Sequence, residues 1–542
     1  MLVRMGQITK VRPGGALAST DRLSRGTIAK YSTGSLGTGG FATLPGLVLV
    51  YFLTDSLGVT AALAGLIVVV AKVWDVLIDP IIGDLSDRSL RRTGSRARFM
   101  RIGAVFLPIF FLATFAVPTA VEGRGAGVWV LVAFIAAATA FSLFQVPYIA
   151  LPAELTENYD ERTRLLTWRV VVLTLAILMF GGGGPMLRAL GGDNERLGYA
   201  IMALVAGLVI ALGFYISSKV APQVAPSAEP AGARVSAIAQ YKLGISVLRR
   251  SKPFRTLLGT FFLQGLATGM MLAGAQYVAK WVLHSESAVT LLFVALIAPA
   301  LLMAPVWGRI ALRVGKEKAF AWATNLFIVG SLALMGLAVA PGAWVYAAVG
   351  LCGAAYAGMQ SLPMAMLPDV ITHDANTEMS AGASRAVGLA AGVSAGLSAG
   401  AEAGAGAGVS AEAEAGLSVG TSAGAEVGAA AAANAGVPAL ESPVSTATTD
   451  DQETRAGVFG GVWTAGETTG MALGSTALTL VLALTGYLES TGSTSVVQPD
   501  SAVLGIVLAF SFIPALATAA SLVTLRAYPL RRADVHRGPG GR

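Results

Sequence analysis

Apolar residues of this chain occur in long blocks separated by short polar segments. Each block has roughly 20 residues, which as a helix rising about 1.5 Å per residue crosses about 30 Å of hydrocarbon. The pattern therefore predicts an all-α membrane protein with twelve transmembrane helices. The expected spans are 34–53, 60–82, 101–120, 127–153, 165–187, 198–218, 256–278, 287–308, 318–340, 343–366, 457–484 and 502–525.

Two sequence echoes indicate an internal repeat. G-D-L-S-D-R at 83–88, after the second span, is echoed by G-R-I-A-L-R at 308–313, after the eighth. P-Y-I-A-L-P-A-E-L-T at 147–156, closing the fourth span, is echoed by P-M-A-M-L-P-D-V-I-T at 363–372, closing the tenth. Two six-helix pseudo-repeat bundles are a transporter architecture, in which the substrate site lies between the bundles near mid-membrane.

Two segments interrupt the repeat. Residues 219–255 form a polar linker, and residues 376–454 are rich in Ala, Gly, Ser and Val, with no aromatic residue between 381 and 440. We expect the second segment to be a low-complexity cytoplasmic insertion without a packed domain; the alternative is an extra spanning helix. The expected division is a tail at 1–33, a bundle at 34–218, the linker at 219–255, four helices at 256–375, the insertion at 376–454, two helices at 455–526 and a tail at 527–542.

Composition narrows the function classes. Hydrophobic residues make up 54% of the 542 and charged residues 13%, which is far from a soluble average of about 25% charged. Three histidines and one cysteine do not supply a dedicated Cys/His metal site or a disulfide. No nucleophile with its base is visible either. We therefore expect neither an enzyme nor a metal or organic cofactor.

The basic residues indicate orientation. Because cytoplasmic loops carry an excess of Lys and Arg, both termini are expected in the cytoplasm, with the chain in the plasma (inner) membrane. The net charge of +7 is attributed to this topology and to anionic lipid, not to nucleic acid. Of 38 Lys and Arg residues, only Arg124, Arg188, Arg196 and Lys280 fall in loops expected outside.

The second span carries three charges on one helical face, Lys72, Asp75 and Asp79. A charge at the centre of a span costs about 2.5–3.5 kcal/mol, so such residues are paired or face an aqueous cavity. We interpret Asp75 and Asp79 as a carboxylate pair that binds a proton or a small hard cation, with Ser142 of the fourth span as a further ligand. The alternative is a structural ion pair between Lys72 and one aspartate.

Charged residues at span ends are interpreted as gates. Carboxylates and arginines at a helix end can form locks between helices that control opening, and this interpretation is preferred to substrate binding. The expected gating residues are Asp84, Asp87, Arg88, Glu154, Arg162, Arg313 and Asp369.

Further polar residues inside spans are candidates for a cavity lining. Gln145 and Arg169 lie in the fourth and fifth spans, and Glu467 stands alone in the apolar eleventh span. A lone intramembrane carboxylate is a functional candidate. For Gln145 and Ser142 the alternative is a hydrogen bond between helices.

Four motifs together resemble a known family. Y-F-L-T-D-S-L-G at 51–58, K-V-W-D-V-L-I-D-P-I-I-G at 72–83, the 147–156 segment and L-P-D-V-I at 367–371 resemble the glycoside-pentoside-hexuronide:cation symporters. These are the melibiose-permease-like branch of the major facilitator superfamily. The resemblance covers the chain except the insertion, and W-D-x-x-x-D-P is its most specific part. It implies the major facilitator fold, alternating access and a cation site at Asp75 and Asp79.

The chain also departs from that family. Sodium-coupled members have an asparagine directly before the second aspartate, where this chain has Ile78, so the resemblance favours a proton over sodium. Sugar-binding members have acidic residues and a tryptophan where this chain has Gly39, Gln145 and Ile149. The family's sugar pocket is therefore not transferred. The expected cavity residues are Lys72, Gln145, Ile149, Arg169, Glu467 and Thr468, the last two standing at or beside the family's eleventh-span lysine.

We expect a secondary active transporter that couples H⁺ or Na⁺ to the symport of a sugar or related small organic solute. Neutralising Asp75 and Asp79 would permit the loaded bundles to reorient. One alternative is a carrier of a lipid-like or amphipathic drug-like substrate. Another is a membrane receptor or scaffold without flux. The expected partners are a small-molecule substrate and the bilayer, and the chain is expected to be monomeric.

Overall fold

The computed structural model describes residues 22–156, 158–223, 237–285, 287–404, 449–491 and 496–530. These residues form helices joined by short turns, and none of them forms a strand. Eleven helical segments among them are long and apolar enough to cross a membrane. A further helix, α12 (Val345–Gly404), occupies the place of the tenth expected span. The predicted all-α membrane fold is confirmed.

The first half contains six spans. The first of them is built from α1 (Arg25–Ser32), α2 (Gly34–Tyr51) and the π-helix η1 (Phe52–Ser56). The others are α3 (Ala61–Thr93), α4 (Ala97–Phe115), α5 (Gly123–Leu155), α6 (Tyr159–Ala189) and α7 (Glu195–Ser218).

The second half repeats this arrangement after α8 (Ala237–Arg250). Its last span is broken at Ser511, because Pro514 lacks the N–H that would continue the hydrogen bonds of a single helix. The helices are α9 (Lys252–Tyr277), η2 (Val278–Val282), α10 (Ala288–Val314), α11 (Lys316–Ala333), η3 (Leu334–Ala338), α12, α14 (Thr449–Leu484), α15 (Asp500–Phe510) and α16 (Phe512–Arg526).

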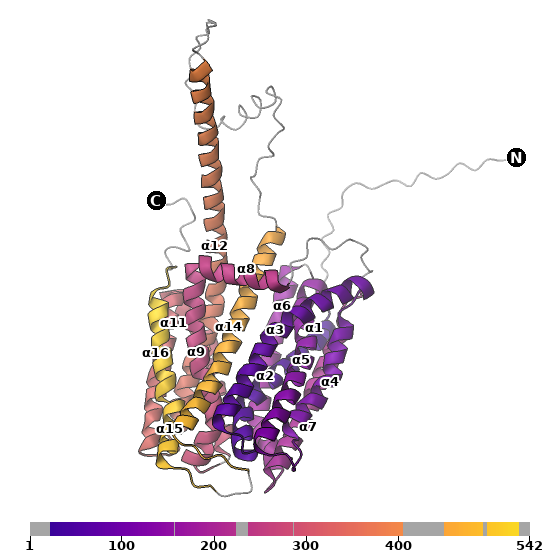
Figure 1. Ribbon diagram of the computed structural model, residues 1–542, viewed down its shortest axis with the longest axis vertical. Coiled ribbons are helices and arrows are strands. Elements are labelled where there is room, and N and C mark those ends of the chain that lie inside the picture. Colours follow the sequence, from indigo (N-terminus) through magenta and orange to yellow (C-terminus); the bar gives the residue numbers. More distant parts are fainter. Residues whose placement is uncertain are drawn as a thin grey trace, which may run out of the picture.

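The two halves stand side by side as helical bundles (Figure 1). Within the first half α4 packs against α5 and α7, and within the second half α10 and α11 pack against α12 while α9 packs against α14 and α16. Helix α8 lies across one end of the bundles, and α12 projects beyond the same end. We call this the α8 end and the opposite one the η1 end.

Several boundaries differ from the sequence expectation: α3 continues to Thr93, past the expected end at 82, and α14 begins at Thr449, inside the expected insertion. Helix α1 begins inside the expected tail, because the Ser24 hydroxyl accepts a hydrogen bond from the Thr27 N–H and caps it. The expected linker contains α8. Helix α12 continues past the expected end of the tenth span to Gly404, since the alanine-rich sequence that follows favours helix. The rest of the expected insertion up to residue 448 lies outside the described residues.

Contacts between the halves gather toward the η1 end. Helix α3 meets α14 at Gly65, where an added Cβ would lie 2.1 Å from the Thr479 hydroxyl oxygen. Helix α6 meets α10 at Gly181, where an added Cβ would lie 2.1 Å from the Phe293 ring. Such close approaches require glycine. The halves are therefore closed against each other at the η1 end.

Candidate functional site

The charged face of α3 forms a compact site with α5. Lys72 Nζ donates to Asp75 Oδ2 at 2.8 Å, and these two side chains are 27% and 23% exposed. The other oxygen of that carboxylate, Asp75 Oδ1, is buried without a hydrogen-bond partner. Asp79 lies one turn further along α3, and the buried hydroxyl of Ser142 on α5 interacts with its side chain. The structure thus brings together all three predicted cation-site residues.

The Lys72–Asp75 ion pair is the structural alternative considered for this face, and it is present. It occupies one oxygen of one aspartate only. Trp74 fixes the position of the site by donating from its indole N–H to Thr139 of α5 at 2.9 Å. Thr139 was not among the candidate residues, although it precedes Ser142 by one helical turn.

Gln145 and Arg169 lie in the first half. The Thr38 hydroxyl of α2 donates to Gln145 Oε1 at 2.8 Å, which leaves the amide N–H groups of Gln145 for other partners. The Arg169 guanidinium lies 5.4 Å from the centre of the Tyr148 ring. Ile149 is 53% exposed. These residues therefore provide donors and one apolar surface in the first half.

Glu467 lies across the molecule in α14. It lines a small cavity within the second half, together with Gln264 and Thr268 of α9 and Tyr356 and Gln360 of α12. No hydrogen bond or ion pair joins Glu467 to the α3 site among the described residues. Thr468 donates to the carbonyl of Thr464 in its own helix.

The polar residues that line this cavity with Glu467 were missed by sequence reasoning. Gln264 and Gln360 are isolated polar residues within apolar blocks, as Gln145 is, and that was the available signal.

The predicted gating residues at the α8 end pair within their own halves. Arg96 bonds to Glu154, Asp87 and Ser86, joining α3, α4 and α5. Burial opposes its charge, but the hydrogen bond to Glu154 and the proximity of Asp87 outweigh burial and hold the pKa of Arg96 above its usual value.

The second half has a matching pair. Lys316, at the start of α11, donates to Asp369 at 2.6 Å, as Arg96 at the start of α4 bonds to Glu154. Both acids are among the expected gating residues, whereas neither of these two cations is. The other predicted gating residues lie nearby: Arg88 pairs with Asp84, Arg162 donates to the Thr156 carbonyl at 3.4 Å, and Arg313 lies in the last turn of α10.

The η1 end carries a buried polar cluster that was not expected. Asp55 is fully buried, and both of its carboxylate oxygens lie within hydrogen-bond distance of the Tyr487 hydroxyl, at 2.7 and 2.8 Å. Thr54 donates to the same carboxylate at 2.7 Å, and Ser490 donates to the Asp55 carbonyl. Tyr487 and Ser490 follow α14, so this cluster fastens the second half to η1 of the first.

Two basic residues support the same closure. Lys280 of η2 pairs with Glu195 of α7 at 3.6 Å. Arg188 was expected in a loop, but it is buried within α6 and donates to Tyr199 and to Gln276 of α9. Arg188 thus lies in the last turn of α6, one residue past the expected end of the span, and hydroxyl and amide groups of neighbouring helices satisfy its guanidinium.

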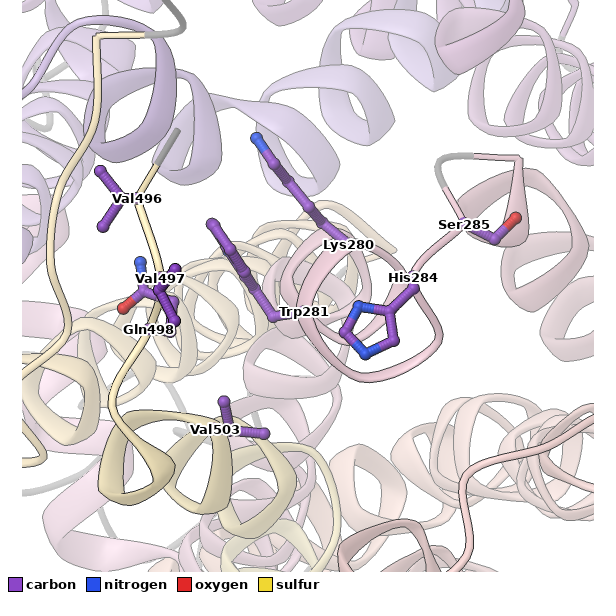
Figure 2. A pocket seen from close by; sticks show the side chains of 8 residues that line it. All are labelled: Lys280, Trp281, His284, Ser285, Val496, Val497, Gln498 and Val503. Atoms are coloured by element: carbon purple, nitrogen blue, oxygen red, sulfur yellow. The ribbon is translucent and has the colours of Figure 1, made fainter. Parts of the chain in front are cut away.

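A cavity of about 440 Å³ opens beside this closure (Figure 2). Lys280, Trp281 and His284 line it from η2 and the following turn, and Val497 and Gln498 line it from the segment before α15. In Figure 2 the Trp281 side chain projects alongside that of Lys280, toward the Val496–Gln498 segment. None of the predicted site residues lines this cavity.

Two six-helix bundles with polar groups on either side of their interface define a membrane transporter of the major facilitator superfamily. The chain belongs to the family described as MFS/sugar transport protein, which matches residues 30–417 and 426–532. The predicted family resemblance is confirmed.

Several curated relatives are symporters. An uncharacterized symporter of Synechocystis sp. is 37% identical over 30% of this chain and 32% of its own length. The putative glycoside/cation symporter YagG of Escherichia coli is 31% identical over 30% and 35%. The isoprimeverose transporter of Lactiplantibacillus pentosus is 26% identical over 53% and 59%. The chain thus aligns with about a third of the first two relatives and somewhat over half of the third.

Solved structures agree on the fold. A bacterial homologue of the human lysosomal transporter Spinster, inward-facing and unoccupied, has a TM-score of 0.56 at 10% identity, over 95% of this chain and 98% of that one. A proton dependent oligopeptide transporter gives 0.56 at 13% identity, over 93% and 98%.

Proposed function

We propose that this protein is a cation-coupled symporter of a sugar or related small organic solute, and that the coupling ion is a proton bound at Asp75 and Asp79. One observation carries the proposal: two carboxylates of α3 lie beside a buried hydroxyl of α5, and one buried carboxylate oxygen, Asp75 Oδ1, has no hydrogen-bond partner. Binding a cation neutralises a site that is costly in hydrocarbon, and this lowers the barrier to reorientation. The symporters among the relatives support the same activity.

Proton coupling is favoured over sodium by the oxygen ligands. A sodium ion requires several oxygens, whereas a proton requires one carboxylate oxygen. Ile78, directly before Asp79, offers no side-chain oxygen.

Closure at the η1 end supports alternating access. By the distribution of basic residues the α8 end faces the cytoplasm of a plasma membrane, so the η1 end is the external side. Asp55, Tyr487 and Ser490 then belong to the external gate.

The test is uptake into proteoliposomes of isoprimeverose and a panel of other sugars, driven by an inward pH gradient. Asp75→Asn and Asp79→Asn are expected to lose at least nine-tenths of gradient-driven uptake and to keep part of the exchange without a gradient, because an amide does not take up the proton. Asp500→Asn, at the first turn of α15, is the matched carboxylate control. Gradient-driven uptake that survives in both aspartate variants would refute the assignment.

A further inference from the structure

The directions of the hydrogen bonds around Gln264 can be assigned. The Thr324 hydroxyl donates to the Phe320 carbonyl at 2.8 Å, and the Ser521 hydroxyl donates to the Thr518 carbonyl at 2.7 Å. Each hydroxyl has a single proton, so both oxygens can only accept from Gln264. Gln264 Nε2 faces them at 3.1 and 3.3 Å, and its Oε1 is buried without a hydrogen-bond partner. This carbonyl oxygen belongs to a residue that lines the Glu467 cavity.

The other polar groups of this cavity are also mainly acceptors. The Thr268 hydroxyl donates its proton to the backbone carbonyl of Gln264 at 3.0 Å, so its oxygen can only accept from a ligand. Gln360 donates from Nε2 to the Tyr356 hydroxyl at 2.6 Å, which leaves its own carbonyl oxygen. Glu467 is an acceptor when ionised. The Tyr356 proton and the second amide proton of Gln360 are the donors that these five side chains still offer to a ligand, against the carbonyl oxygens of Gln264 and Gln360, the Thr268 hydroxyl oxygen and the Glu467 carboxylate.

The charge of this cavity also favours a ligand that carries hydrogen-bond donors. No cation pairs with Glu467 among the described residues, and the two basic residues expected to line the cavity are engaged elsewhere. Lys72 is bonded to Asp75, and Arg169 lies over Tyr148. An ionised carboxylate inside the membrane is costly unless a cation joins it.

We propose that this acceptor wall binds the transported solute through the solute's hydrogen-bond donors, with a protonated amino group beside Glu467, and that it discriminates against carboxylate-bearing solutes. The substrate class is then an aminated, polyhydroxylated solute such as an amino sugar. The proposal rests on the transport function above, and it adds Gln264, Tyr356 and Gln360 as specificity-determining residues.

The electrostatic part is tested by labelling rates that need no substrate. In purified protein with Cys352→Ala, a thiol introduced as Met471→Cys, at an apolar position of the same cavity, is reacted with cationic and with anionic methanethiosulfonates of equal size. The cationic reagent is expected to react faster, and Glu467→Gln should lower the ratio of the two rates by about tenfold. Asp500→Asn should leave the ratio unchanged. A thiol that reacts with neither reagent, or a ratio unaffected by Glu467→Gln, overturns the proposal.

The selectivity is tested by protection of the same thiol. Glucosamine should halve the labelling rate at a concentration at least tenfold below that needed for glucose, and glucuronate should not protect. The advantage of glucosamine should disappear in Glu467→Gln. Equal protection by the three sugars, or protection by glucuronate, contradicts the proposal. Protection by glucosamine without gradient-driven uptake would instead contradict the transport function alone.

Discussion

Acidic residues inside the spans differ in what satisfies them. Asp75 is half satisfied by Lys72, Asp79 by Ser142, and Glu467 by no cation in the described chain. Asp55 is the opposite case, since it is fully buried and held by Tyr487 and Thr54. An unsatisfied carboxylate is free to bind a transported ion or solute, whereas a fully satisfied one stabilises a conformation.

Sequence reasoning found the first three acids and missed the fourth. Asp75, Asp79 and Glu467 interrupt apolar blocks, so their cost in hydrocarbon made them visible. Asp55 stands where an apolar block ends, and there an acidic residue is ordinary. Tyr487 and Ser490, which bond to it from the other half, lie more than 400 positions further along the chain.

Ser142 separates proton from sodium coupling. Ser142→Ala removes an oxygen that a metal ion would use but leaves both carboxylates for a proton. We expect this variant to keep at least a third of pH-driven uptake in proteoliposomes, and sodium to add no uptake in either protein. Ser361→Ala, which removes a hydroxyl bonded to its own helix at Ala357, is the control. A tenfold loss in Ser142→Ala alone would indicate that the hydroxyl binds a metal ion.

At the scale of elements, most helices follow from the apolar blocks. Lengths near 20 residues and the exclusion of charges fix where each span lies. Helix capping and helix propensity account for the helical segments that the apolar blocks did not show. These are α1 with its Ser24 cap, α8 in the linker, and the continuation of α12 to Gly404.

Arg96 joins three helix ends at the α8 end through its ion pairs with Glu154 and Asp87. The Arg96 side chain is 12% exposed, and Arg96→Ala leaves both carboxylates without their cation. We expect a loss of about 3 kcal/mol in the free energy of unfolding. Lys316→Ala breaks the matching pair in the second half, where the lysine is 40% exposed, and should cost about 1 kcal/mol or less. Denaturant titration of the two variants in detergent measures the free energy of unfolding of each. Equal losses of this free energy in Arg96→Ala and Lys316→Ala would contradict the ranking.

At the scale of the whole molecule, the relation between the halves is set at the η1 end. Glycines at Gly65 and Gly181 permit close contact, and the Asp55–Tyr487 hydrogen bonds lie among the contacts that must break when this end opens. At the α8 end, the ion pairs of Arg88, Arg96, Arg164 and Lys316 each join residues of the same half. The η1 end, where hydrogen bonds and close contacts join the two halves, is therefore the closed end.

Tyr487→Phe should shift this equilibrium toward opening. A hydrogen bond to a charged group contributes about 1.5–3 kcal/mol, so its loss should raise the open population at least tenfold. Spin labels at Asp193→Cys and Val497→Cys, two exposed positions on opposite halves, report the separation by pulsed dipolar spectroscopy. Native Cys352 is buried and stays unlabelled. Tyr215→Phe, on the exposed face of α7, is the control. Identical distance distributions in Tyr487→Phe and the unmodified protein would refute the gate.

The sequence by itself determined the membrane class, the twofold repeat and the carboxylate pair of α3. Each depends on spacing along one segment: block length against bilayer thickness, echoed motifs, and charges three and four residues apart on one helical face. Only the tertiary structure decided which groups interact with the charged and polar residues of the spans. Ser142 beside Asp79, Tyr487 on Asp55, Arg96 between Glu154 and Asp87, and the acceptors around Glu467 come from different helices. Hydrogen bonds and ion pairs act over a few ångströms in space, and packing alone brings residues of separate spans within that range.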